Sequence, residues 1–103
     1  MPQIEVEQRD DVEQFLSRFL VRVSDDTTST SHEVTLSRSD YERLGSDFPS
    51  PDALITACFE FLLSREPKEQ ILGSFDVGQI ETYFPEFRRE IGRFVPGGPQ
   101  EPP

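Results

Sequence analysis

The strongest pattern of apolar and polar positions lies in residues 50–67, SPDALITACFEFLLSREP. Apolar side chains recur there at the three- and four-residue spacing of an α-helix, over a surface broad enough to be covered on most sides. Ser50 is a good N-cap and Pro51 suits the first helical position, whereas Pro67 ends the helix near residues 65–66. We therefore predict a core helix whose apolar surface comprises Leu54, Ile55, Cys58, Phe59, Phe61, Leu62 and Leu63.

Two segments before this helix alternate between apolar and polar residues, as strands with one buried face do. They are residues 19–24 and 32–37, and the polar stretch between them predicts a hairpin loop of about 5–7 residues. Two strands are marginally stable alone, so their apolar side must lie on the core helix. That side comprises Phe19, Val21, Val23, Val34 and Leu36.

The pattern is weaker at the start of the chain, where residues 1–14 are acidic and residues 10–18 fit two structures. A short helix would use Val12, Phe15, Leu16, Phe19 and Leu20. A strand would instead place Phe15, Phe19, Val21 and Val23 on one side. We interpret these residues as a short helix that runs into a strand near Arg18.

Caps and breakers predict several shorter helices. Ser37 begins one that ends at Gly45, a natural left-handed terminator. Residues 67–73, with Ile71 and Leu72 inward, residues 76–84 and residues 87–94 form three more, the second of which has Asp76 as its N-cap and Gln79 at the third position. We expect the aromatic residues Phe75, Tyr83, Phe84 and Phe87 to close the other side of the core.

These elements predict a small α+β fold, in which a β-hairpin packs on a central helix and further short helices complete the core. We expect a single domain over residues 17–95. An acidic, partly ordered segment of residues 1–16 precedes it. Residues 96–103, PGGPQEPP, are too rich in proline and glycine to build a core, and we expect them to be disordered.

The charge of the chain limits the classes of molecule that it can bind. Its formal net charge is −10, from 20 acidic and 10 basic residues. Such a field repels phosphate backbones and anionic membranes and favours basic partners. The sequence also lacks the pattern of a signal peptide or a transmembrane helix, so we expect a cytoplasmic protein that binds neither nucleic acid nor membrane.

Catalytic and metal-binding motifs are missing from the sequence. His32 is its only histidine and Cys58 its only cysteine, so they would form the one possible pair of nucleophile and base. We expect Cys58 to be a buried small hydrophobe and His32 to lie at the rim of the core or on the surface. There is no metal-ligand spacing and no phosphate-binding glycine loop. We therefore predict a protein that is not an enzyme and uses no cofactor.

The order of strand, short helix and longer helix over residues 32–66 resembles the ribbon–helix–helix family of bacterial repressors and antitoxins. In that family the strand pairs across a dimer and its outward residues enter the major groove. The resemblance implies a dimeric DNA-binding regulator or antitoxin as the alternative function. The equivalent strand, HEVTLS, contains no basic residue, however, and Glu33 would face phosphates or bases.

A second resemblance covers residues 32–87. The segments HEVT, FEFLLSREP, FD and IETYFP follow in this order and are similar to segments shared by a group of short bacterial proteins of uncharacterised function. That resemblance implies no catalytic or binding residue.

We predict a non-catalytic accessory or regulatory protein that binds another protein, because the chain has many aromatic residues for its length and no catalytic set. The chain could act as a monomer or as a homodimer. The candidate contact residues are Arg65, Glu66, Tyr83, Phe84, Phe87 and Phe94.

Overall fold

A computed structural model describes residues 3–9, 16–45 and 48–94 of the chain. The expected tail of residues 96–103 and the start of the expected N-terminal helix lie outside these residues. The strands are β1 (Gln3–Gln8), β2 (Leu16–Ser24), β3 (Ser29–Ser37) and β4 (Ser74–Asp76). The α-helices are α1 (Arg38–Leu44), α2 (Pro51–Arg65), α3 (Val77–Tyr83) and α4 (Phe87–Glu90), and the 3₁₀ turns are η1 (Lys68–Gln70) and η2 (Ile91–Phe94).

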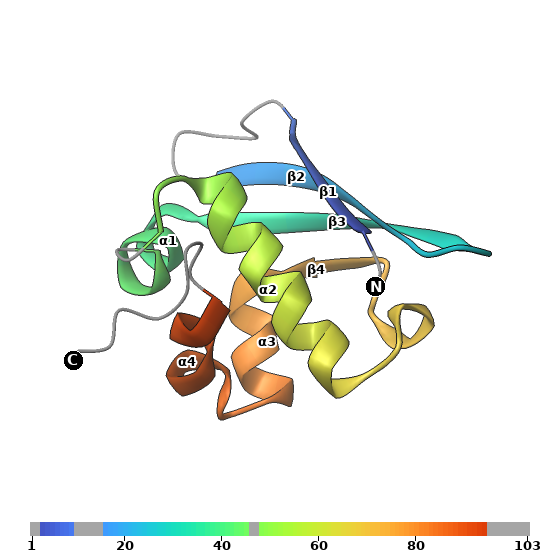
Figure 1. The fold of residues 1–103 in the computed structure, drawn as a ribbon. Helices are drawn as coiled ribbons and strands as arrows, with labels where there is room; N and C mark the ends of the chain where they lie inside the picture. Colours follow the sequence, from blue (N-terminus) through green and yellow to red (C-terminus); the bar gives the residue numbers. More distant parts are fainter. Residues whose placement is uncertain (1–2, 10–15, 46–47, 95–103) are drawn as a thin grey trace, which may run out of the picture.

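The architecture is the predicted α+β fold, with a sheet on one side and the helices on the other (Figure 1). The sheet has the order β1-β2-β3-β4, in which the first three strands are antiparallel and β4 runs parallel to β3. All five residues predicted for the apolar side of the hairpin are buried: Phe19, Val21, Val23, Val34 and Leu36. The alternation of the two strands therefore identified the inner face of the sheet correctly.

The hairpin loop is shorter than predicted and contains only residues 25–28. The Asp25 carboxylate accepts hydrogen bonds from the backbone N–H groups of Thr27 and Thr28, both at 2.9 Å. This side-chain turn lets β3 begin at Ser29, paired with Ser24. Residues 29–31, which the polar pattern places in the loop, therefore extend the strand instead.

The N-terminal segment supplies an edge strand, β1, that its weak pattern did not predict. Ile4 and Val6 pair with Val23 and Val21 of β2, and both are half-buried against the core. β2 itself begins at Leu16, so the strand interpretation is correct from this residue onward. The helix interpretation is therefore wrong for Leu16 and Ser17. The rest of the expected helix, residues 10–15, lies outside the described part of the chain.

The core helix forms as predicted. The Ser50 hydroxyl accepts from the backbone N–H of Ala53 at 3.2 Å, and Pro51 is the first helical residue. The helix ends at Arg65, where the N–H of the cap residue Glu66 donates to the carbonyl of Leu62. Seven of its residues are buried: Leu54, Ile55, Ala57, Cys58, Phe59, Phe61 and Leu62. Leu63 is only half-buried.

Helix α1 has the predicted Ser37 cap, which accepts from the N–H of Asp40 at 3.1 Å. Gly45 ends it, but not in the left-handed conformation that we expected, because its φ is −97°. Close packing explains the glycine instead. A Cβ atom at this position would lie 2.5 Å from the ring of Tyr41, so a larger residue would force the ring to move.

The segment after α2 departs most from prediction. A 3₁₀ turn, η1, replaces the expected helix, and residues Ser74–Asp76 form β4. Phe75 and Ile71 point inward, whereas Leu72 is 48% exposed and not buried as expected. In extended chain two neighbouring residues face opposite sides, so Ile71 and Leu72 cannot both reach the core.

Helix α3 begins with the predicted capping box, in which Asp76 accepts from the N–H of Gly78 and Gln79 accepts from the N–H of Asp76. The last predicted helix, residues 87–94, is present as α4 followed by η2. Phe61 of α2 makes edge-on ring contacts with Phe84, Phe87 and Phe94. These contacts fix the C-terminal helices against the core helix.

Candidate functional site

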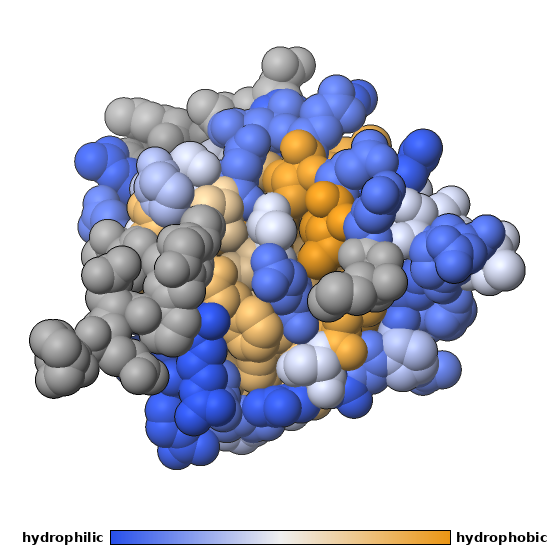
Figure 2. All heavy atoms as spheres, in the orientation of Figure 1, coloured by the Kyte–Doolittle hydropathy of each residue, from blue (hydrophilic) through white to orange (hydrophobic). Residues whose placement is uncertain are grey.

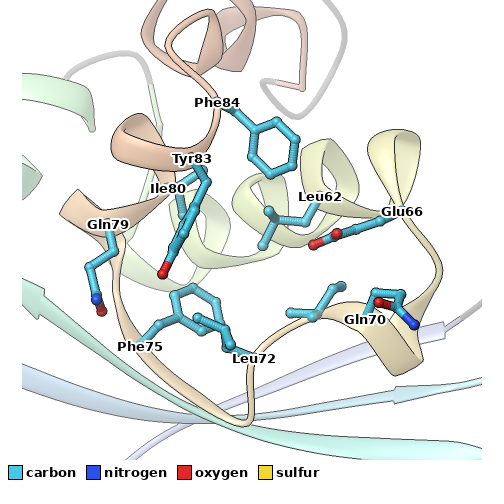
Figure 3. Close-up of a pocket in the computed structure, with 10 residues that line it drawn as sticks. Leu62, Glu66, Gln70, Leu72, Phe75, Gln79, Ile80, Tyr83 and Phe84 are labelled. Carbon is cyan, nitrogen blue, oxygen red and sulfur yellow. The ribbon is translucent and has the colours of Figure 1, made fainter.

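A groove opens beside the C-terminal half of α2, and we call it the α2–α3 groove. Its volume is about 360 Å³. Its walls come from α2, from η1 and the turn after it, from β4 and from α3 (Figure 3). The lining residues are Leu62, Glu66, Gln70, Ile71, Leu72, Phe75, Gln79, Ile80, Tyr83 and Phe84.

The groove has an apolar floor and an exposed apolar mouth. Leu62, Phe75 and Ile80 form part of the buried core. Leu72 is 48% exposed and Tyr83 is 62% exposed, the two largest values among the large hydrophobic residues of the described chain. Because these two side chains are exposed, the groove offers apolar surface that the described residues leave uncovered. Figure 2 shows that apolar residues also gather across the middle of the side that carries the helices, with hydrophilic residues around them.

Glu66 is the one charged side chain among the ten that line the groove. Its backbone caps α2, but its half-buried carboxylate makes no hydrogen bond or ion pair with the described residues. The other polar groups of the lining are the amides of Gln70 and Gln79 and the hydroxyl of Tyr83. The groove is thus apolar inside and weakly acidic at its edge.

The wall formed by residues 68–75 is fastened to the hairpin at several points. Lys68 Nζ pairs with the Asp25 carboxylate at 2.6 Å. The Leu72 carbonyl is hydrogen-bonded by His32 at 2.7 Å, and the Gly73 carbonyl accepts from the backbone N–H of Glu33 at 2.8 Å. These bonds hold the wall in place, so the groove exists before any partner arrives.

His32 is an internal support of this wall. It is 2% exposed, which corrects the prediction of a rim or surface position. A carbonyl can only accept, so Nδ1 carries the proton donated to Leu72, and Nε2 is hydrogen-bonded to the Thr30 hydroxyl at 2.8 Å. The ring also packs on Phe59, with 5.3 Å between centroids. Both nitrogens are therefore engaged in structural bonds.

The ion pairs of Lys68 set the electrostatics at the far end of the same wall. This side chain is 6% exposed and binds the carboxylates of Asp25 and Glu69. The hydrogen bond from Lys68 is the main cause that lowers the pKa of Asp25, and the amides of Thr28 and Thr27 lower it further. The hydrogen bonds from Lys68 to the two carboxylates also raise the pKa of Lys68, and the one to Glu69 lowers the pKa of Glu69. The ammonium thus stays charged and bound.

Three of the predicted contact residues meet in the groove. They are Glu66, Tyr83 and Phe84, which come from the end of α2 and the end of α3. Figure 3 shows them on different sides of Leu62. Tertiary packing brings these residues together across 17 positions of the sequence, between 66 and 83.

The other three predicted contact residues lie elsewhere. Phe87 is fully buried, so it offers no surface to a partner. Phe94 is half-buried against Phe61. Arg65 lies with its guanidinium 4.8 Å from the centre of the Phe61 ring and pairs with Glu86 at 3.2 Å. It therefore links α2 to the C-terminal helices and lies outside the groove lining.

Most of the groove was missed by sequence reasoning. The sequence pattern predicts Leu72 in the core and predicts no strand at Phe75. β4 has three residues, too few for alternation to be visible. The adjacent pair Ile71–Leu72, followed directly by a glycine, was the available signal that one apolar side chain had to face outward.

The structure does not assemble a catalytic pair from His32 and Cys58. Both nitrogens of His32 are bonded to Thr30 and Leu72, and Cys58 is fully buried. Burial raises the pKa of this thiol well above its usual value. Among the described residues, no three histidine, cysteine or acidic side chains gather into a metal site.

The helices in the described part of the chain are too short or too polar to cross a membrane. Comparisons with protein-family models, with curated proteins and with solved structures gave no match to this chain.

Proposed function

We propose that this protein is a small non-catalytic accessory or regulatory protein that binds another protein through the α2–α3 groove. The observation that carries the proposal is the exposure of Leu72 and Tyr83 at the mouth of a preformed apolar groove. Exposed apolar surface of this kind marks interaction sites, and tyrosine is among the residues that contribute most to binding energy. The proposal includes a cytoplasmic location and membership of the bacterial group that residues 32–87 resemble.

The ribbon–helix–helix alternative gains no support from the strand order. In that family the strand is free to pair with a second chain. Here β3 is hydrogen-bonded on one side to β2 and on the other to β4, both from the same chain. The negative net charge also opposes binding to a phosphate backbone.

The proposal is tested by affinity capture with matched variants. Leu72→Ser and Tyr83→Ser remove apolar surface at the groove mouth, and both side chains are exposed enough for the fold to tolerate the change. Leu20→Ser is the control, because Leu20 is 36% exposed on the outer face of the sheet, away from the groove. Each protein is immobilised and presented to lysate from the native cell.

We expect a protein that is captured by the wild type and by Leu20→Ser and that is reduced about tenfold or more by either groove variant. Circular dichroism establishes that all the variants are folded. Equal capture by all four proteins, or loss with the Leu20 control alone, would show that the groove is not the binding site.

A further inference from the structure

We propose that the partner presents a basic segment to the α2–α3 groove, in which an apolar side chain covers the floor and a neighbouring lysine or arginine pairs with Glu66. This inference rests on the proposed function and adds the chemistry of the partner. It follows from the charges in and around the groove.

The apolar part of the occupant is set by the floor. The groove volume of about 360 Å³ is near the lower end of the range of ligand pockets, about 300–1,000 Å³. It therefore suits one or two side chains of a segment and not a whole domain surface. Leu62, Phe75 and Ile80 lie at its base, so the inserted side chain must be apolar or have an apolar stem.

The cationic part is set by Glu66. Both cations next to it in the sequence are already committed to other carboxylates. Arg65 binds Glu86 and Glu90, and Lys68 binds Asp25 and Glu69. No cation of the described chain neutralises Glu66, so the complementary charge has to come from the partner.

The geometry favours a cation beside the apolar floor. Figure 3 shows the Glu66 carboxylate turned toward Leu62, with the ring of Tyr83 on the opposite side of that residue. The groove therefore has its one carboxylate on one side of the apolar floor and the ring of Tyr83 on the other. The amide oxygen of Gln70 adds an acceptor at the same edge.

The field of the whole molecule acts in the same direction. A net charge of −10 attracts basic segments at a distance and speeds their association. It opposes a second copy of this chain, which would bring the same net charge and a second Glu66 to the contact. A basic segment of another protein is therefore the occupant that the charges favour.

The test begins with selection from a phage-displayed library of random 12-residue peptides on the immobilised wild-type protein. Phage that also bind Leu72→Ser are removed, so that only groove-dependent peptides remain. We expect the remaining sequences to combine a large apolar residue with at least one nearby lysine or arginine. The affinity of a selected peptide is then measured by fluorescence polarisation at low and high salt.

The decisive variant is Glu66→Gln, which removes the charge and keeps the shape. We expect it to weaken binding about three- to fivefold, as for a partly exposed ion pair, and to make binding less dependent on salt. Glu60→Gln is the matched control: it makes the same charge change on the same helix, at an exposed position outside the groove lining. It should leave the affinity nearly unchanged.

The other outcomes separate the two proposals. Groove-dependent peptides that are neutral or acidic, or equal effects of Glu66→Gln and Glu60→Gln, overturn the basic-segment inference and leave the groove as the binding site. A selection that yields no groove-dependent peptide overturns both. A dimer in light scattering that Leu72→Ser converts to a monomer would identify a second copy as the occupant and would also overturn the inference.

Discussion

At the scale of single residues, His32 shows how a polar side chain in the core can shape the surface. Its ring donates to the Leu72 carbonyl and thereby holds the wall of the groove. We expect His32→Phe to keep the ring contact with Phe59 but to leave this carbonyl without its donor. The cost should be about 1–3 kcal/mol of unfolding free energy, measured by urea denaturation.

Thr30→Val is the control for this prediction, because it removes only the hydroxyl that bonds the other ring nitrogen. Its cost should be smaller than that of His32→Phe. Unchanged stability of His32→Phe would mean that the carbonyl finds another partner and that the histidine does not hold the wall.

Cys58 gives a second prediction at this scale. The thiol is fully buried on α2, and burial raises its pKa, so the reactive thiolate is scarce and inaccessible. We expect no reaction of the native protein with Ellman's reagent over an hour at pH 8, and stoichiometric reaction in denaturing urea. A rapid stoichiometric reaction of the native protein would show that the core around α2 opens readily.

At the scale of elements, sequence reasoning succeeded where a cap and a long apolar pattern agreed. Helix α2 has both, and the hairpin strands have a clear alternation, so their faces were predicted correctly. β1 and β4 were missed because their few apolar residues become meaningful only once β2 and β3 supply partners. Their formation depends on pairing across the sheet, which a local pattern does not contain.

The candidate site was only partly predicted for the same reason. Tyr83 and Phe84 stood out as aromatic residues near the end of a helix, and Glu66 as part of a polar turn. The opposite wall follows β4 and the turn before it, so Leu72 and Phe75 could not be placed in the groove before the strand was known.

The loop between β2 and β3 gives a prediction about how stability depends on pH. Lys68 and two backbone amides lower the pKa of Asp25 in the folded protein relative to about 3.9 in the unfolded chain. A carboxyl group with a lowered pKa stabilises the fold above its unfolded pKa, and this contribution is lost as the pH falls below it. Asp25→Asn should therefore be less stable than the wild type at pH 7.

The difference between the two proteins should narrow as the pH falls from about 4 toward the lower folded pKa, because the wild-type carboxylate is then protonated progressively. Urea denaturation at pH 7, 5 and 3 measures it. The asparagine of the variant keeps the side-chain oxygen for the turn, so the comparison isolates the charge. A difference that stays constant over this range would show that the ion pair with Lys68 does not contribute.

At the scale of the whole molecule, the acidic residues differ in whether a basic residue of the same chain neutralises them. Most of the arginines are paired with carboxylates of the same chain, as Arg18 is with Glu33 on the outer face of the sheet. Acidic residues outnumber basic ones two to one, and among the described residues the carboxylates of Glu5, Asp26, Asp52, Glu60 and Glu66 have no such partner. The groove and the edge strand β1 are two places where unpaired carboxylates can decide which molecules bind.

The edge strand β1 supplies the last prediction. An edge strand exposes unpaired backbone groups that a second sheet could bind. Glu5 and Glu7 are exposed, and of the two only Glu7 forms an ion pair with a described residue, Arg9 at 3.5 Å on the surface. Antiparallel pairing of two copies would bring these carboxylates together. We therefore expect a monomer of 11.8 kDa in light scattering over a wide range of concentration. The double variant Glu5→Thr, Glu7→Thr should form dimers at high concentration, because threonine removes the repulsion and favours strands.

The control is the double variant Asp26→Asn, Asp52→Asn, which removes two exposed charges away from β1 and should remain monomeric. If both double variants dimerise, net charge and not the edge strand prevents association. If neither variant dimerises, the carboxylates of Glu5 and Glu7 are not what prevents two copies from pairing through β1. A wild-type dimer at every concentration would contradict the prediction outright. It would also return attention to the ribbon–helix–helix alternative, since that fold requires two chains, and salt-dependent titration with DNA would then be the next measurement.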